Sequence, residues 1–105
     1  MSKWHRVASA ADVREGEAFA AELEGTPIAL YRIDGQVHAI DDTCTHEFAM
    51  LSEGFIESGT IECPLHAAQF DIATGKCLCG PAMEDLRAYQ VRVDGDDIFV
   101  LAPDA

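Results

Sequence analysis

Positive charge is scarce in this sequence. Seven lysines and arginines stand against 19 aspartates and glutamates, which gives a formal net charge of −12. So few cations argue against binding to nucleic acid or to anionic membrane surfaces, both of which need basic patches. The acidity favours a basic protein partner, because opposite fields speed encounter, although it also serves solubility alone.

Long apolar segments are also missing. No stretch of about 18 apolar residues exists, so we expect no membrane-spanning helix. The first six residues lack the apolar run of a signal peptide, and we expect a cytoplasmic protein. A chain of 105 residues suffices for one hydrophobic core but not two, so we expect a single domain over residues 1–105.

Signatures of catalysis are absent as well. The sequence holds no nucleophile–base motif, phosphate-binding glycine loop or dinucleotide fingerprint. It also offers no plausible site of two histidines and one carboxylate for a mononuclear iron. We therefore expect this chain not to be an enzyme by itself.

Short β-like runs separated by turn residues fill most of the chain. Asp34-Gly35 and Ser58-Gly59 are strong signals for tight hairpins, and no segment has a long helical period. The pattern predicts an all-β, mostly antiparallel fold, a small sandwich or barrel. The predicted strands are 18–23, 27–33, 36–40, 55–57, 60–62, 69–72, 86–93 and 97–101.

Two segments fit this β pattern poorly, and each holds one cysteine and one histidine. The first box reads Cys44-Thr45-His46 and the second reads Cys63-Pro64-Leu65-His66, with 16 residues between them. Loops on a rigid β scaffold are common places for functional sites. Cysteines near histidines in a cytosolic chain indicate metal binding more than disulfides.

The mixed composition of the two boxes narrows the choice of metal. Zinc fingers usually pair cysteine with cysteine and histidine with histidine. A four-cysteine cluster would need Cys77 or Cys79 and would leave both box histidines unused. A Rieske centre has two cysteines on one iron and two histidines on the other, which two mixed boxes supply directly. A zinc site, or no metal, remains the alternative.

The chain resembles the Rieske family in these boxes and in the segments that follow them. Residues 70–75 are similar to the family's strand and turn after the second box, and 80–82 to its proline loop, with the likeness running from about 28 to 101. The resemblance implies a small antiparallel fold with a cluster-binding subdomain of two loops, about residues 42–82. It implies one [2Fe–2S] cluster. The implied ligands are Cys44, His46, Cys63 and His66.

The other cysteines and histidines are predicted to have ordinary structural roles. Cys77 and Cys79, two residues apart on a strand, are expected to point to the same face, but strain makes a disulfide between them unfavourable. Packing is the usual role of such cysteines, so we predict neither as a ligand. His5 and His38 lie outside the boxes and are expected to be surface or hairpin residues.

The neighbours of the boxes bear on the redox potential. The resemblance also covers high-potential members of the family, which have two extra cysteines, a serine and a tyrosine near the cluster. At the corresponding positions this chain has Ala49, Leu65, Ala68 and Phe70. Fewer hydrogen bonds to the cluster stabilise its reduced form less, so we expect a potential of about −150 mV. The acidic Asp41, Asp42, Glu47 and Glu62 should act in the same direction, weakly if solvated.

This combination resembles the ferredoxins of bacterial aromatic-ring dioxygenase systems. The resemblance implies a monomeric carrier of single electrons, taken from a flavoprotein reductase and passed to a terminal oxygenase. A small Rieske-like subunit of an assimilatory nitrite reductase, or of another oxidoreductase complex, is the alternative.

Two sets of loop residues are predicted around the cluster. Apolar side chains would shield it or contact partners, or simply pack the loops: Phe48, Met50, Leu65 and Pro81. Acidic side chains would form a rim for basic partners, or only a solvated face: Asp41, Asp42, Glu47 and Glu53. The histidine-ligated iron is expected to take the electron, because neutral ligands leave it the more electron-poor.

Overall fold

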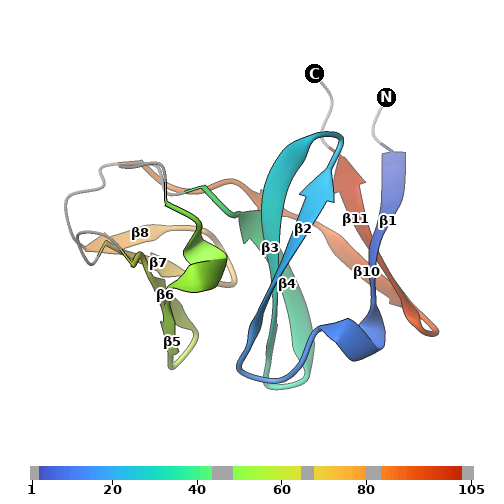
Figure 1. Ribbon diagram of the computed structural model, residues 1–105, viewed down its shortest axis with the longest axis horizontal. Coiled ribbons are helices and arrows are strands. Elements are labelled where there is room, and N and C mark those ends of the chain that lie inside the picture. Colours follow the sequence, from blue (N-terminus) through green and yellow to red (C-terminus); the bar gives the residue numbers. More distant parts are fainter. Residues whose placement is uncertain (1–2, 44–48, 65–67, 80–83, 103–105) are drawn as a thin grey trace.

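The computed structural model describes residues 3–43, 49–64, 68–79 and 84–102 (Figure 1). These residues form eleven strands and two short 3-10 turns, η1 (Ala10–Asp12) and η2 (Leu51–Glu53). The strands are β1 (Lys3–Ser9), β2 (Ala18–Leu23), β3 (Thr26–Ile33), β4 (Gln36–Asp41), β5 (Phe55–Glu57), β6 (Thr60–Glu62), β7 (Gln69–Asp71), β8 (Cys77–Cys79), β9 (Ala88–Tyr89), β10 (Val91–Asp94) and β11 (Asp97–Ala102).

The strands make three antiparallel sheets, in the orders β1-β11-β10, β2-β3-β4-β9 and β5-β6-β7-β8. The predicted all-β, antiparallel fold is confirmed. The first two sheets pack against each other, and the β5–β8 sheet lies at the far side of β2-β3-β4-β9 (Figure 1). Within the described residues, no helix is long and apolar enough to cross a membrane.

Tight turns explain why the two predicted hairpins form where they do. Asp34 and Gly35 have φ angles of 52° and 80°, and Ser58 and Gly59 have 49° and 77°. Two successive positive φ values define the turn whose twist matches that of paired strands. The strands on either side of both turns are confirmed within a residue.

The predicted strand 86–93 is wrong as a continuous element. β9 pairs with β4, whereas β10 pairs with β11, so the chain changes sheets at Gln90. The Gln90 carbonyl accepts a hydrogen bond from the Leu101 backbone N–H at 3.0 Å. Alternation within one segment cannot reveal such a change, because both halves keep a period of two.

Two strands, β1 and β8, were not predicted. β1 is largely exposed and pairs with β11, with a bulge between Arg6 and Ala8. In β8 the register with β7 also shifts, so that Leu78 is extra between Cys77 and Cys79. This register shift interrupts the regular alternation on which the shared-face prediction rests.

The buried side chains of the described residues form two clusters. One lies between the first two sheets and includes Ile28, Ile98 and Val100. The other joins the β2-β3-β4-β9 sheet to the β5–β8 sheet, and in it Tyr31 and Phe70 are fully buried. Burial raises the pKa of Tyr31 above the ordinary tyrosine range. The second cluster therefore gives the β5–β8 sheet a rigid base.

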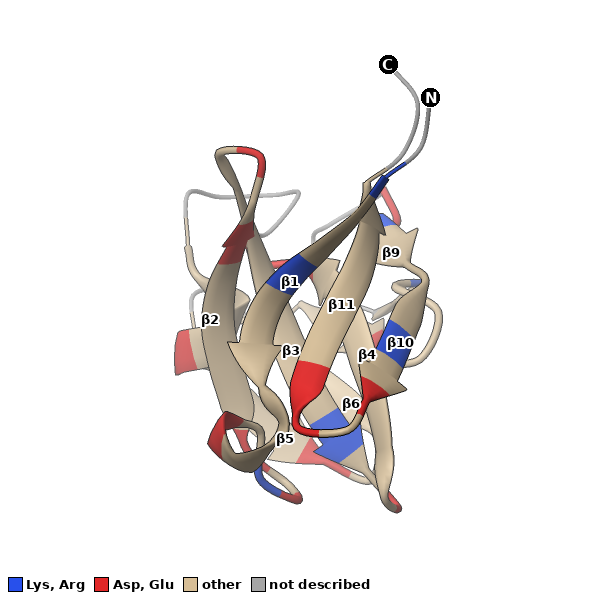
Figure 2. Ribbon diagram, turned by 90° about the vertical axis from the view of Figure 1, so that its right-hand side faces the viewer, with Lys and Arg blue, Asp and Glu red and all other residues tan. Residues whose placement is uncertain are grey.

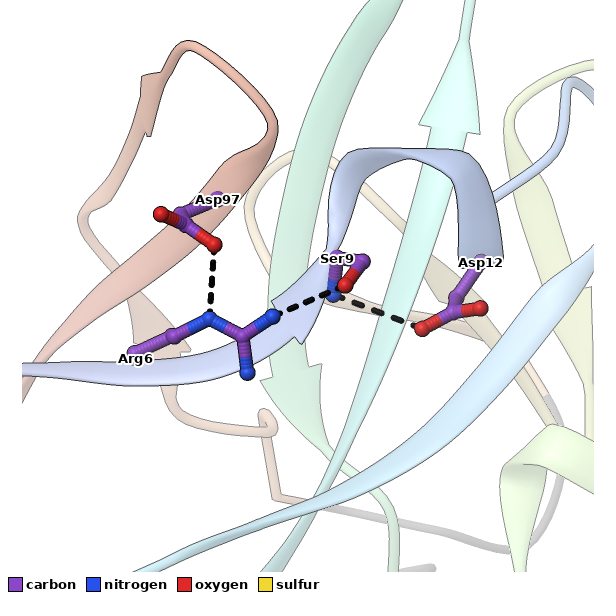
Figure 3. A network of polar contacts seen from close by, with 4 residues as sticks. All are labelled: Arg6, Ser9, Asp12 and Asp97. Carbon is purple, nitrogen blue, oxygen red and sulfur yellow. Dashed lines mark hydrogen bonds and ion pairs between the residues drawn. The ribbon is translucent and has the colours of Figure 1, made fainter.

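A polar network holds the start of the chain to its end (Figure 3). The Arg6 guanidinium donates to the Asp97 carboxylate at 2.7 Å and to the Ser9 hydroxyl at 2.8 Å. The Ser9 backbone N–H in turn donates to Asp12 at 3.4 Å, at the start of η1. Arg6 and Asp97 belong to β1 and β11, whose sheet lies across β2-β3-β4-β9 from the β5–β8 sheet (Figures 1 and 2), so this network supports the scaffold and not the predicted metal site.

Candidate metal centre

The second box begins at the end of a strand, where a short hairpin loop leaves the sheet. Cys63 directly follows β6, and Ala68 directly precedes β7. The Cys63 backbone N–H donates to the Ala68 carbonyl at 2.7 Å, which closes the loop at its base. Cys63 itself is 1% exposed. The backbone therefore fixes this cysteine at the boundary between the core and the loop.

The first box lies in a loop that is closed in the same manner. This loop connects β4 to η2, and Thr43 and Met50 form a β-bridge across its base. The Leu51 backbone N–H donates to the Asp42 carbonyl at 2.7 Å, next to the bridge. Both boxes thus sit on loops whose two ends are held together.

Asp42 is the side chain that fastens the first loop. Its two carboxylate oxygens accept from the Ser52 backbone N–H at 2.6 Å and from the Ser52 hydroxyl at 2.8 Å. Asp42 is fully buried, and this burial raises the pKa of its carboxyl despite the two hydrogen bonds from Ser52. The prediction that Asp42 belongs to an exposed acidic rim is therefore wrong, because its carboxylate is buried and hydrogen-bonded to Ser52.

Asp41 is also engaged within the molecule. The Tyr89 hydroxyl donates to one of its carboxylate oxygens at 2.5 Å, and the Arg87 backbone N–H to the other at 3.3 Å. Burial, followed by this hydrogen bond, raises the pKa of Tyr89. Asp41 is half-buried and Glu53 is exposed, so of the predicted rim within the described residues only Glu53 faces solvent fully.

The bases of the two loops meet in one buried cluster. Ala49 from the first loop lies in the same cluster as Cys63 and Ala68 from the second, with Leu51 and Phe70. All five are at most 6% exposed. The structure thus brings the bases of the two box-bearing loops into one buried cluster, which also holds Cys63.

A third connection, between β8 and β9, returns to the same cluster. The Leu86 backbone N–H donates to the Gly75 carbonyl at 2.7 Å, and the Cys77 backbone N–H to the Asp85 carboxylate at 2.8 Å. Cys77 is half-buried and packs against this cluster, in agreement with the packing role predicted for it. The Nε2 of His5 lies 2.8 Å from a Glu24 carboxylate oxygen, and His38 lies in the β3–β4 hairpin, opposite Tyr31.

Several predicted site residues lie outside the described residues, and the structure does not test their roles. These are Cys44, His46, Glu47, Phe48, Leu65, His66 and Pro81. Within the described part of the chain, no three histidine, cysteine or acidic side chains gather as a metal site. The described member of the predicted ligand set is Cys63.

Sequence reasoning missed two supports of the loops. One is the pair of Asp42 and Ser52, ten residues apart, for which the sequence holds no signal beyond two polar residues flanking an irregular segment. The other is Gly54, where an added Cβ would lie 2.0 Å from the Glu62 carbonyl oxygen. A glycine just before a predicted strand was a usable signal for a close backbone approach.

Replacing Asp42 with alanine is expected to lower the apparent unfolding temperature by about 10 °C. The change removes two hydrogen bonds and leaves the Ser52 N–H without its acceptor, at a cost of about 2–3 kcal/mol. Ser52→Ala is the matched control: it removes only the hydroxyl bond and should cost about 1 kcal/mol. Thermal unfolding followed by circular dichroism measures both, and equal shifts would contradict the role given to Asp42.

Comparison with known proteins establishes the family. The sequence model of the Rieske [2Fe-2S] domain family matches residues 3–90, most of the chain. The chain belongs to the Rieske [2Fe–2S] family and carries one cluster of the Rieske type. The described site fits such a group, because Cys63 is buried at the base of one loop and shares a cluster with small alanine side chains from the bases of both loops.

Within this family, the relatives with high sequence identity are ferredoxin components of dioxygenase systems. The chain is 49% identical over 96 residues to the 3-phenylpropionate/cinnamic acid dioxygenase ferredoxin subunit of Escherichia coli K12, covering 90% of each chain. It is 37% identical over 98 residues to the ferredoxin component of the naphthalene 1,2-dioxygenase system of Pseudomonas aeruginosa, covering 93% of this chain and 94% of that one.

Solved structures agree with these relatives. The ferredoxin of carbazole 1,9a-dioxygenase from Nocardioides aromaticivorans IC177 superposes with a TM-score of 0.88 at 36% identity, covering 92% of this chain and 95% of that one. The terminal oxygenase of carbazole 1,9a-dioxygenase from Novosphingobium sp. KA1 gives 0.89 at 28% identity, but only 30% of its length is covered. This chain is accordingly an electron-transfer component and not a catalytic subunit.

Proposed function

We propose that this protein is a low-potential carrier of single electrons in an aromatic-ring-hydroxylating dioxygenase system. It takes electrons from a flavoprotein reductase and delivers them to the terminal oxygenase, as a cytoplasmic monomer. The observation that carries this proposal is the match with dioxygenase ferredoxins over nearly the whole length of both chains. A related ferredoxin is also known in a complex with its oxygenase, that of carbazole 1,9a-dioxygenase.

We further propose that the cluster is held by Cys44, His46, Cys63 and His66 within a single domain, whose cluster-binding subdomain spans about residues 42–82. When bound, the [2Fe–2S] group supplies the site that accepts and releases one electron. The chain supplies the rest. The hydrogen bond from Cys63 to Ala68 holds one ligand loop, and Asp42 holds the other.

The buried cluster of side chains around Cys63 supports the low potential. Ala68 and Phe70 are fully buried beside Cys63, and neither side chain has a hydrogen-bond donor. Donors near the cluster sulfurs stabilise the more negative, reduced state and raise the potential. Their lack at these two positions favours a midpoint near the lower end of the Rieske range, about −150 mV.

Ala68→Ser is expected to raise the midpoint potential by about 40 mV. The new hydroxyl supplies one donor beside Cys63, and a hydrogen bond worth about 1 kcal/mol to the reduced state corresponds to this shift for one electron. Ala88→Ser, on exposed β9, is the control and should leave the potential unchanged. Spectroelectrochemical titration measures both, and a lowered midpoint in Ala68→Ser would contradict the donor argument.

The electron-carrier function can be tested by substitution into a known system. The purified, cluster-loaded protein is added to the reductase and oxygenase of the Escherichia coli 3-phenylpropionate/cinnamic acid dioxygenase system, with that system's own ferredoxin left out. Substrate-dependent product formation that rises with the amount of added protein supports the proposal. Oxidised protein that no flavoprotein reductase can reduce would overturn it.

The alternative as a nitrite reductase subunit receives less support. The small subunit of a putative NADH-dependent nitrite reductase from Mycobacterium tuberculosis has a TM-score of 0.87, but its identity is 23%. A likeness at that level shows the shared fold alone. The dioxygenase ferredoxins match both in fold and at 36–49% identity.

A further inference from the structure

The β5–β8 sheet exposes an aromatic side chain on the face opposite the core. Phe55, the first residue of β5, is 65% exposed, the largest value among the exposed large hydrophobic residues described. Its neighbour Ile56 points the other way and packs against the buried cluster. A single exposed apolar side chain is common on protein surfaces, so the residues around Phe55 decide whether it marks a binding surface.

Strand register places Phe55 in a row of polar residues. Phe55 pairs with Glu62, and Glu62 pairs with Gln69, while Glu57 pairs with Thr60. Directly paired residues share a face of the sheet. The same residues, with Ser58, line one shallow hollow, and Phe55 also borders a second hollow that reaches Glu17 and Ser52. We call the surface of Phe55, Glu57, Thr60, Glu62 and Gln69 the β5–β7 face.

The β5–β7 face is negatively charged around its aromatic centre. Glu57 is exposed and Glu62 half-buried, and no ion pair to either carboxylate is present within the described residues. The Gln69 amide donates to Glu62 at 3.1 Å, which orients that carboxylate without neutralising it. Exposed Glu53 lies just before Phe55 in the chain. Carboxylates that have no ion pair among the described residues, set around an apolar centre, match a partner of opposite charge.

This face also lies next to the proposed cluster site. Glu62 is the last residue of β6, and the next residue is Cys63, the described member of the ligand set. In contrast, the exposed Arg6 and Arg92 lie on the sheet β1-β11-β10, at the other end of the molecule (Figures 1 and 2). The acidic surface is thus on the side of the cluster, and these cations are not.

We propose that the β5–β7 face is the docking surface for a redox protein that carries basic side chains around an apolar recess. Phe55 enters the recess, and Glu57 and Glu62 meet the basic rim. A second copy of this chain is disfavoured as the occupant, because two molecules of net charge −12 repel each other. The proposal rests on the proposed function, since it names the surface by which that carrier meets a partner.

The test measures electron transfer from the reduced, cluster-loaded protein to cytochrome c, a basic haem protein, in stopped flow. One electron leaves the reduced cluster and reduces one ferric haem. Phe55→Ser removes the aromatic centre, and Glu57→Gln removes one rim charge. Val93→Ser, 48% exposed on β10, and Asp96→Asn, in the exposed β10–β11 turn, are the matched controls at the opposite end.

At low ionic strength, Phe55→Ser should lower the second-order rate constant about fivefold and Glu57→Gln about twofold. Neither control should change it by a comparable factor, and the effect of Glu57→Gln should fade as salt is added. With the small acceptor ferricyanide, Phe55→Ser should react like the unchanged protein.

Equal rates for Phe55→Ser and Val93→Ser with cytochrome c would overturn the docking surface. Equal changes of the rate constant in Glu57→Gln and Asp96→Asn would also overturn it, because the rate would then depend only on the net charge of the protein. Iron and labile sulfide analysis of the unchanged protein separates this failure from that of the proposed function. If the cluster-loaded protein reduces ferricyanide, but Phe55→Ser leaves the rate with cytochrome c unchanged, the carrier function stands and only the proposed docking surface is wrong.

Discussion

Replacing Cys63 with alanine is expected to abolish binding of the [2Fe–2S] cluster. Cys63 is proposed as one of two thiolate ligands, and a Rieske cluster has no spare protein ligand to replace it. The side chain is 1% exposed in a buried cluster that also holds Ala49, Ala68 and Phe70, and alanine is smaller than cysteine, so the substitution adds no volume to the core. Iron and labile sulfide should fall from about two of each per chain to near zero.

Cys77→Ala is the matched control for this loss. Cys77 belongs to the same sheet and packs against the same buried cluster, but it is predicted not to be a ligand. The variant loses one small packing contact and should keep its full iron and sulfide content. Loss of the cluster from Cys77→Ala, or its retention in Cys63→Ala, would contradict the proposed ligand set.

Replacing Gly54 with alanine is expected to disrupt both the fold and the loading of the cluster. The added Cβ would lie 2.0 Å from the Glu62 carbonyl oxygen and 3.1 Å from that of Leu51. Both obstacles are backbone, so a strand must move, and Glu62 directly precedes Cys63. We expect a loss of about 3 kcal/mol or more, or about 12 °C in the apparent unfolding temperature.

Gly95→Ala separates this steric effect from a general cost of replacing glycine. Gly95 has a φ of 61°, but no atom lies within 4 Å of an added Cβ. Its replacement should cost about 1 kcal/mol, from backbone strain alone, and should leave cluster content unchanged. A Gly54→Ala protein as stable and as fully loaded as Gly95→Ala would contradict the close approach seen between Gly54 and Glu62.

Local patterns were sufficient to predict the strands that are joined by tight turns. Asp34-Gly35 and Ser58-Gly59 require positive φ at both positions, and their neighbours alternate, so each hairpin is specified by its own residues. β1 and the division of 86–93 at Gln90 depend on pairing with β11, near the other end of the chain. Such long-range pairing leaves little trace in the local sequence.

The family could be predicted from the spacing and composition of the two boxes. The packing of the side chains around the boxes could be predicted only in part. Ala49, Ala68 and Phe70, which the resemblance singled out, share one buried cluster with Cys63. The prediction of an acidic rim was wrong at Asp42, because a carboxylate next to a loop can also hold that loop in place through hydrogen bonds. Whether such a residue is buried depends on tertiary packing, which the local sequence does not show. Ligation by Cys44, His46 and His66 remains a prediction.

Electron paramagnetic resonance of the dithionite-reduced protein tests the central claim of mixed cysteine and histidine ligation most directly. Iron with neutral histidine ligands and iron with thiolate ligands differ in electronic environment, and the spectrum reports this difference. We predict a rhombic signal whose average g value lies well below that of the free electron. A signal typical of four-thiolate [2Fe–2S] ferredoxins, or a protein that contains zinc and no iron, would contradict the account.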